Sequence, residues 1–137
     1  MVKKVYMARA IIRFNNKYLL LKKAKDSVML ENIGKWETPG GIMDKTGPDK
    51  TILREVEEET GLRCTIIKEL PFLCMKDDKI DSQASMFLLE APSDQVRLSD
   101  EHSDFIWIKA SEVKNLKLVV YASLLLEYFN NEDRYLK

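Results

Sequence analysis

The first segment with a clear hydrophobic pattern, residues 2–14, has the two-residue period of a β-strand. One alternating face carries Tyr6, Ala8, Ala10, Ile12 and Phe14, and the other carries Val5, Met7, Arg9, Ile11 and Arg13. Because both faces hold apolar side chains, we expect both to be partly covered. Asn15 and Asn16 tolerate positive φ, so they predict a hairpin turn into a second strand over residues 17–23.

Residues 48–60 have the spacing of an amphipathic helix. Pro48 suits the first helical position, where a missing N–H costs nothing. Ile52, Leu53 and Val56 form an apolar stripe. Gly61 is typical of the position just past a helix end, with Leu62 behind it to close that end hydrophobically.

Further strands are expected over residues 82–90 and 105–108. Residues 64–75 predict either one strand or two short strands broken near Pro71. Residues 118–130 predict an apolar amphipathic helix that lies on the sheet, and residues 131–137 predict a polar tail. No repeat or linker is evident, so we expect one domain over residues 1–137.

Composition narrows the class of protein. A chain of 137 residues has the size of one domain and can bury a core. Its 22 basic residues balance 22 acidic ones, so no overall field favours nucleic acid or a membrane as partner. Cys64 and Cys74 lack metal-type spacing and predict reduced thiols. With no apolar run near the length of a membrane span, we expect a cytoplasmic protein.

Glutamates crowd the end of the predicted helix, at Glu55, Glu57, Glu58 and Glu59. A helix C-terminus is already negative, and each carboxylate there costs roughly 0.3–1 kcal/mol. Glu55, Glu58 and Glu59 share one helix face, so their repulsion is mutual. A divalent cation would turn that repulsion into attraction, and carboxylate oxygens suit Mg²⁺ or Mn²⁺. The alternative interpretation is a solvated acidic helix end.

The segment REVEEETGL, residues 54–62, resembles the second half of the Nudix box. WETPGG, residues 36–41, is similar to the strand and turn that lead into that box, and EHSDFIW, residues 101–107, is similar to an acidic-then-tryptophan segment of many family members. The resemblance implies an α/β (α+β) fold. This is the Nudix-type α/β/α sandwich with a mixed sheet, the box helix and a C-terminal helix.

One position departs from the family pattern. Gly40 fits the start of the box, but Thr46 stands where the family has a glutamate. We infer a re-spaced loop in which Asp44 or Asp49 partly substitutes for that glutamate.

The resemblance implies Mg²⁺-dependent cleavage of a pyrophosphate bond in a nucleoside diphosphate linked to a further group. The ion, for which Mn²⁺ is an alternative, would be held mainly by Glu58 and Glu59. The Gly40 carbonyl and Glu55 would complete the metal site.

Catalysis also needs a base for the attacking water. Family members differ in the carboxylate they use, and our order of preference is Glu101, then Glu55, then Asp104. Arg54 would orient a neighbouring carboxylate. His102, the one histidine in the sequence, is expected to be a bystander in an exposed loop.

Candidate substrate-binding residues are Arg9, Lys23 and Gly41. Arg9 lies in mid-strand, where an unpaired charge is expensive, so it either faces a phosphate-binding cleft or forms a structural ion pair. Lys23 lies where the family often has a cation near the phosphates. Gly41 adjoins Gly40, and two adjacent glycines let the backbone approach something closely.

Markers of several substrate subgroups are not evident, which favours a nucleoside triphosphate cut to the monophosphate and pyrophosphate. An ADP-ribose pyrophosphatase is the enzymatic alternative, and a non-catalytic nucleotide-sensing module is the alternative of another class. The expected partner is a small-molecule nucleotide, not nucleic acid or a membrane, and a homodimer, common in the family, stays open.

Overall fold

A seven-stranded mixed sheet forms the centre of the computed structural model, which describes residues 2–26, 29–76, 78–119 and 122–137. Its strands are β1 (Lys3–Phe14), β2 (Lys17–Lys23), β3 (Trp36–Glu37), β4 (Gly40–Ile42), β5 (Thr65–Lys76), β6 (Ile80–Glu90) and β7 (His102–Ile108). The helices are α1 (Pro48–Thr60), α2 (Ala122–Asn130) and α3 (Glu132–Tyr135), with short 3-10 helices η1 (Leu30–Asn32) and η2 (Ala110–Asn115). The strand order is β3-β2-β1-β6-β5, with β4 beside β1 and β7 beside β2. Only the β1–β6 pair among these is parallel.

The local turn and helix signals in the sequence are confirmed. Asn15 and Asn16 have φ of 49° and 62°, as a tight hairpin turn requires. Pro48 begins α1, and Gly61 ends it at φ 74° with its N–H donated to the Glu57 carbonyl. Each of these conformations is dictated by residues next to one another in the chain.

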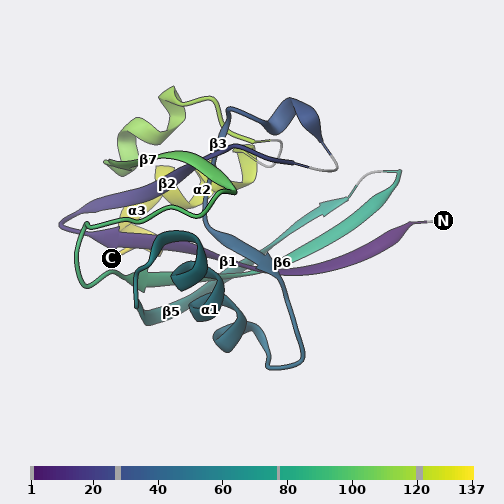
Figure 1. The fold of residues 1–137 in the computed structure, drawn as a ribbon, viewed down its shortest axis with the longest axis horizontal. Helices are drawn as coiled ribbons and strands as arrows, with labels where there is room; N and C mark the ends of the chain where they lie inside the picture. The colour runs from purple at the N-terminus through teal and green to yellow at the C-terminus, as the bar shows by residue number, and fades with distance from the viewer. Residues whose placement is uncertain (1, 27–28, 77, 120–121) are drawn as a thin grey trace.

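Helices cover the two faces of the sheet, so the predicted sandwich is confirmed (Figure 1). α1 packs Ile52 and Val56 against one face, together with Ile12 of β1. α2 packs Leu125 and Phe129 against the other face, in a cluster that includes Ile11 of β1. Successive side chains of β1 therefore pack alternately into two separate hydrophobic cores, one on each face of the sheet. Across the described residues, no helix has the length and apolarity needed to cross a membrane.

The strands β1 and β2 diverge after their turn, and this divergence makes room for the segment that carries Gly40 and Gly41. They pair at Arg13↔Tyr18 and Phe14↔Lys17, but further along Arg9 pairs with Gly40 of β4. On β2, Leu21 pairs with Glu37 of β3. The segment from β3 to β4 therefore crosses the gap between the two diverging strands, fixed midway by a hydrogen bond from the Ala10 N–H to the Pro39 carbonyl (2.9 Å).

Pro71 lies within a single strand, β5, rather than between two short strands. The pairing of β5 with β6 shifts register between Leu70 and Leu73, which accommodates the missing N–H of Pro71. The Pro71 carbonyl accepts a hydrogen bond from the Tyr128 hydroxyl of α2. This irregularity lies on the outer strand of the sheet and is tied to the helix layer.

The predicted helix over residues 118–130 starts too early. Leu118 forms an isolated parallel bridge with Trp36, and the Val119 N–H donates to the Trp36 carbonyl (3.0 Å). The backbone there is extended because it pairs with β3, so α2 begins only at Ala122. Val120 and Tyr121, which the prediction included in the helix, lie outside the described residues.

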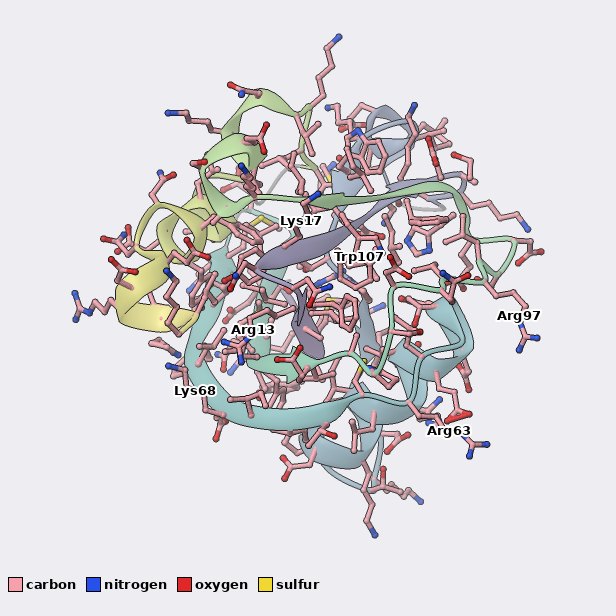
Figure 2. All side chains as sticks on the ribbon, turned by 90° about the vertical axis from the view of Figure 1, so that its left-hand side faces the viewer. Arg13, Lys17, Arg63, Lys68, Arg97 and Trp107 are labelled. Carbon is pink, nitrogen blue, oxygen red and sulfur yellow. The ribbon has the colours of Figure 1, made fainter. Side chains whose placement is uncertain are left out.

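The predicted polar tail over residues 131–137 is wrong, because this segment packs. α3 occupies most of it, and Leu136 is fully buried in the core beside α2. Arg13 donates to the Leu136 carbonyl (2.6 Å) and Lys68 donates to the Lys137 carbonyl (3.3 Å). Both side chains reach the C-terminal end of the chain, Arg13 from β1 and Lys68 from β5, the strands on either side of β6 (Figure 2). Leu136 and Tyr135, which also packs against this core, are two large side chains among polar neighbours, so the composition of the segment does not predict its packing.

We expect Leu136→Ala to lower the free energy of unfolding by about 2–5 kcal/mol, because it opens a cavity in the core. Asp133→Ala is the matched control, since the Asp133 side chain is 94% exposed on the same helix. Its effect should stay within about 0.5 kcal/mol in urea unfolding. Equal stabilities of the two variants would contradict the packing of this segment.

Candidate active site

The turn that carries Gly40 and Gly41 has no room for side chains. A Cβ at Gly40 would lie 2.3 Å from the Ala8 carbonyl oxygen and 2.7 Å from the Arg9 Cγ. A Cβ at Gly41 would lie 2.6 Å from the Glu55 carboxyl carbon. The close approach predicted for these two glycines is therefore confirmed, and it brings β4 directly against β1 on one side and α1 on the other.

The three glutamates on one face of α1 occupy different environments. Glu59 is 4% exposed and accepts a hydrogen bond from the Gly40 N–H (3.2 Å). Glu55 is half-buried beside Gly41. The Glu58 side chain is 58% exposed and lies 3.4 Å from Arg54. The helix end thus turns two carboxylates toward the glycine turn and one toward solvent.

Burial and like charges disfavour the ionised form of two of these glutamates. Burial raises the pKa of Glu59 to about 8, and the charges of Glu37 and Glu101 add to the rise, while the Gly40 N–H and Arg9 oppose it. The pKa of Glu55 is also raised, first by burial and then by the charge of Glu58. The helix end carries more negative charge than its surroundings balance.

Asp44, one of the two candidates to substitute for the glutamate of the family pattern, is held by hydrogen bonds from Thr46 and Thr51. Its carboxylate accepts hydrogen bonds from the Thr46 N–H (2.8 Å), the Thr46 hydroxyl (2.5 Å) and the Thr51 hydroxyl (3.1 Å). It also pairs with Arg54 at 2.6 Å. These hydrogen bonds, those from Thr46 first, lower the pKa of Asp44 to about 2. Asp49, the other candidate, is exposed in the first turn of α1.

Arg54 is held between carboxylates, as predicted. Besides Asp44 it contacts Glu55 at 3.3 Å and Glu58 at 3.4 Å. One guanidinium therefore links the loop before α1 to two glutamates of the helix. Its short contact with Asp44 ties the guanidinium to the loop, whereas its contact with the exposed Glu58 is long and weak.

A cleft of about 460 Å³ lies over the glycine turn. Among the described residues its lining combines cations, carboxylates and backbone: Met7, Arg9, Lys23, Lys25, Asp26, Glu37, Gly40, Gly41, Ile42, Glu59, Glu101 and His102. Six candidate site residues are thus brought together: Arg9, Lys23, Gly40, Gly41, Glu59 and Glu101. Glu55 adjoins this cleft behind Gly41, and its pKa responds to the charge of Glu101.

The three remaining candidates neither line nor adjoin the cleft. Arg54 and Glu58 are on the exposed side of α1. Asp104 is exposed on β7, where its carboxylate accepts the Phe105 N–H at 2.8 Å.

An apolar cavity of about 380 Å³ continues from the cleft. The two hollows share Met7, Arg9, Lys23, Asp26 and Ile42. The further lining of the cavity is mainly apolar: Val5, Met29, Leu73, Met75, Ile80, Ala84 and Leu124. Sequence reasoning missed this cavity, because its walls come from β1, β2, β4, β5, β6, η1 and α2, which are spread over most of the chain.

The expectation that His102 is exposed is wrong. It is 6% exposed, and its Nε2 lies 2.9 Å from a carboxylate oxygen of Glu37. The reason is that β7 begins at His102, three residues earlier than predicted, and pairs this residue with Lys23. Sequence reasoning also assigned no role to Glu37, which is buried beside Trp36.

Arg9 forms the structural ion pair that was one of its two predicted roles. It lies 3.6 Å from Glu37 and donates to the Thr38 carbonyl at 2.9 Å. Lys23 lies 3.5 Å from Glu37 and 3.2 Å from Asp26. Both cations also line the cleft, so the ion pairs leave them at its surface.

The carboxylates of the candidate site do not converge on one point in this structure. Among the described residues, no three His, Cys, Asp or Glu side chains converge closely enough to hold a metal as they stand. Glu58 is the carboxylate turned away, by an exposed contact with Arg54.

A family model for the NUDIX domain matches residues 5–129. A MutT-like protein of Streptomyces ambofaciens is 30% identical over 125 residues, which cover 90% of this chain and 75% of that protein. A nucleoside triphosphatase NudI of Klebsiella pneumoniae subsp. pneumoniae is 24% identical over 119 residues, covering 79% of this chain and 84% of the relative.

Solved structures share the fold over nearly the whole chain. The MutT protein of Methanosarcina mazei Go1 has a TM-score of 0.82 at 26% identity, with 97% of each chain covered. The NUDIX domain of Shewanella oneidensis NrtR, solved with ADP ribose, has a TM-score of 0.77 at 19% identity, covering 98% of this chain and 90% of that one. Together with the domain match, these likenesses show that the chain belongs to the Nudix hydrolase family, whose enzymes act on pyrophosphate bonds of nucleoside diphosphate derivatives.

Proposed function

We propose that the protein is a Mg²⁺-dependent pyrophosphohydrolase that converts a nucleoside triphosphate into its monophosphate and pyrophosphate, with Mn²⁺ as an alternative ion. The observation that carries this proposal is one continuous hollow with two ends. One end combines the carboxylates of Glu59 and Glu101 with the cations Arg9 and Lys23, and the other end is apolar. A nucleoside triphosphate is divided in the same way, with a charged polyphosphate chain at one end and a nucleoside at the other. The name of the Klebsiella relative, nucleoside triphosphatase, supports the choice of substrate.

The residues present fit a hard divalent ion. Glu55, Glu58 and Glu59 offer only oxygen donors, and burial, followed by the charges of Glu37 and Glu101, raises the pKa of Glu59, so a cation beside it would favour its ionised form. Glu58 must turn inward to join them. Its pair with Arg54 is exposed, and such pairs are worth about 0–1 kcal/mol, so the rotation costs little. We assign the ion mainly to Glu58 and Glu59, with Glu55 and the Gly40 carbonyl completing the site.

A bound ion would neutralise the phosphates and lower the pKa of the attacking water. Glu101 is our choice of base, because it lines the cleft together with Glu59. Glu55 is the second choice, and the exposed position of Asp104 leaves it last. The base takes a proton as the water oxygen bonds to the α-phosphorus, and the bond to the pyrophosphate leaving group breaks. Arg9 and Lys23 would bind phosphate oxygens, beside the backbone of Gly41.

The test is a substrate panel. We expect Mg²⁺ with ribo- and deoxynucleoside triphosphates to yield monophosphate and pyrophosphate, resolved by ion-exchange chromatography, and ADP-ribose to be a poorer substrate. Faster cleavage of ADP-ribose would favour the alternative enzyme. Tight nucleotide binding without product from any compound would identify a non-catalytic sensor instead.

Glu58→Gln should lower Mg²⁺-dependent kcat at least a hundredfold, because a charged ligand of the ion is lost. The matched control is Glu57→Gln on the same helical turn, since Glu57 points to Arg63 at 3.3 Å and away from the cleft. That control should keep activity within about twofold. Near-normal, weakly metal-dependent turnover by Glu58→Gln would contradict the metal assignment.

Glu59→Gln should stabilise the protein in a chelator at high pH. The unfolded carboxyl titrates near 4.5 and the folded one near 8, so between these values the folded state binds more protons. Stability of the unsubstituted protein therefore falls as pH rises from about 4.5 to about 8. We expect the variant to melt higher above pH 8 and equally near pH 4. The prediction would be contradicted if the difference in melting temperature between the variant and the unsubstituted protein did not grow with pH, or if added Mg²⁺ did not reduce that difference.

Asp44→Asn should lower kcat/KM about tenfold or more, roughly 1.4 kcal/mol in the barrier, because it weakens the hold on Arg54. Asp49→Asn, exposed in the first turn of α1, should stay within twofold. Thr46→Glu should change activity by less than tenfold, since Asp44 already supplies the carboxylate. A large gain from Thr46→Glu would show that Asp44 does not substitute for the missing glutamate.

A further inference from the structure

A buried pair, Glu37 and His102, spans β2 from one side to the other. Glu37 lies on β3 and pairs with Leu21, whereas His102 begins β7 and pairs with Lys23. The two side chains are 7% and 3% exposed, and their contact is 2.9 Å. They connect two strands that flank β2 and do not pair with each other.

Charges around Glu37 fix the direction of that hydrogen bond. Burial would raise the pKa of Glu37, but the hydrogen bond from His102 and the charges of Arg9 and Lys23 lower it overall. Glu37 is therefore an ionised acceptor, so the Nε2 of His102 carries the proton and donates it. An imidazole held in this way has one orientation. The pair is a fixed strut and not a mobile contact.

Each end of this strut adjoins one wall of the cleft. Glu37 precedes Gly40 by three residues, and its partner Arg9 lies against Gly40 and holds the Thr38 carbonyl at 2.9 Å. His102 directly follows Glu101, whose carbonyl accepts the Ala24 N–H at 2.9 Å. The Glu101 side chain itself is exposed. Its position over the cleft depends on how the backbone around it is held.

We propose that Glu37 and His102 are positioning residues that hold the Glu101 carboxylate over the glycine turn at the distance catalysis requires. Neither touches the reacting atoms. The inference rests on the proposed function, in which Glu101 is the base. A carboxylate shifted by about 1 Å still allows nucleotide binding but loses much of its rate advantage. The loss should therefore fall on kcat and leave KM nearly unchanged.

The substitutions separate positioning from plain packing. His102→Leu keeps a buried apolar side chain but removes the donor, whereas His102→Gln keeps an N–H that can reach Glu37. We expect His102→Leu to lower kcat at least tenfold with KM within threefold, and His102→Gln to recover kcat to within threefold. In Glu37→Gln/His102→Leu the loss should not exceed that of the worse single variant, because both act through one contact.

Hydrogen exchange at the Ala24 amide supplies a readout independent of turnover. Protection should fall at least tenfold in His102→Leu, be kept in His102→Gln, and be unchanged at the core amide of Leu89 in both. Unaltered Ala24 protection, additive losses in the double variant, or equal kcat in the Leu and Gln variants would overturn the proposal. If His102→Leu fails to fold, Glu37→Leu, which removes the acceptor, must alone show the kcat loss and the lower protection.

Failure of the proposed function gives a different pattern. Wild-type protein that cleaves no nucleotide would remove the assignment of Glu101 as base. Loss of Ala24 protection in His102→Leu would then still establish the pair as the strut of this loop. Active wild-type protein whose kcat is insensitive to both His102 variants would leave the hydrolase intact and overturn the positioning role.

Discussion

The gap between the diverging strands β1 and β2 is crossed at its tightest point by two glycines, where no side chain fits. Where β1 leaves β2, residues 36–42 fill the space, and Gly40 and Gly41 approach β1 and α1 too closely for any Cβ. This contact brings the acidic end of α1 against a backbone amide and not into open solvent. The burial of Glu59, the half-burial of Glu55 and the floor of the cleft all follow from it.

Two buried carboxylates beside this turn, those of Glu37 and Glu59, differ in how well the surrounding groups stabilise their ionised forms. Glu37 is surrounded by Arg9, Lys23 and His102, which keep it charged despite burial. Glu59 receives a single backbone N–H and faces other carboxylates, so its pKa rises to about 8. The first has its charge matched inside the protein and can serve as scaffold. The second has charge left unmatched, which is the condition for taking up a proton or a cation.

Features set by neighbouring residues could be predicted from the sequence. Asn15 and Asn16 specify their turn, and Pro48 and Gly61 specify the ends of α1, since each acts through its own backbone. The sandwich and the carboxylates of the site followed from a motif that covers a contiguous helix. These predictions needed no knowledge of distant contacts.

The remaining features depend on partners far along the chain. His102 is buried because Glu37, 65 residues away, receives its hydrogen bond. Asp44 and Asp49 were equivalent candidates until the folded loop placed only Asp44 beside Arg54. Leu136 is buried by residues of both β1 and α2, which its polar neighbours do not reveal. Composition near a residue does not report what packs over it.

Pro71 has a consequence for how two molecules meet. It interrupts β5, the outer strand of the sheet, and its carbonyl is taken by Tyr128. The same strand exposes Phe72 to 64%, and an uninterrupted apolar edge of this kind is a template for aggregation. A strand from another molecule finds no N–H at Pro71 and a bend beside it, so it cannot pair along the full edge. Pairing of two copies edge to edge would be interrupted at this point of β5.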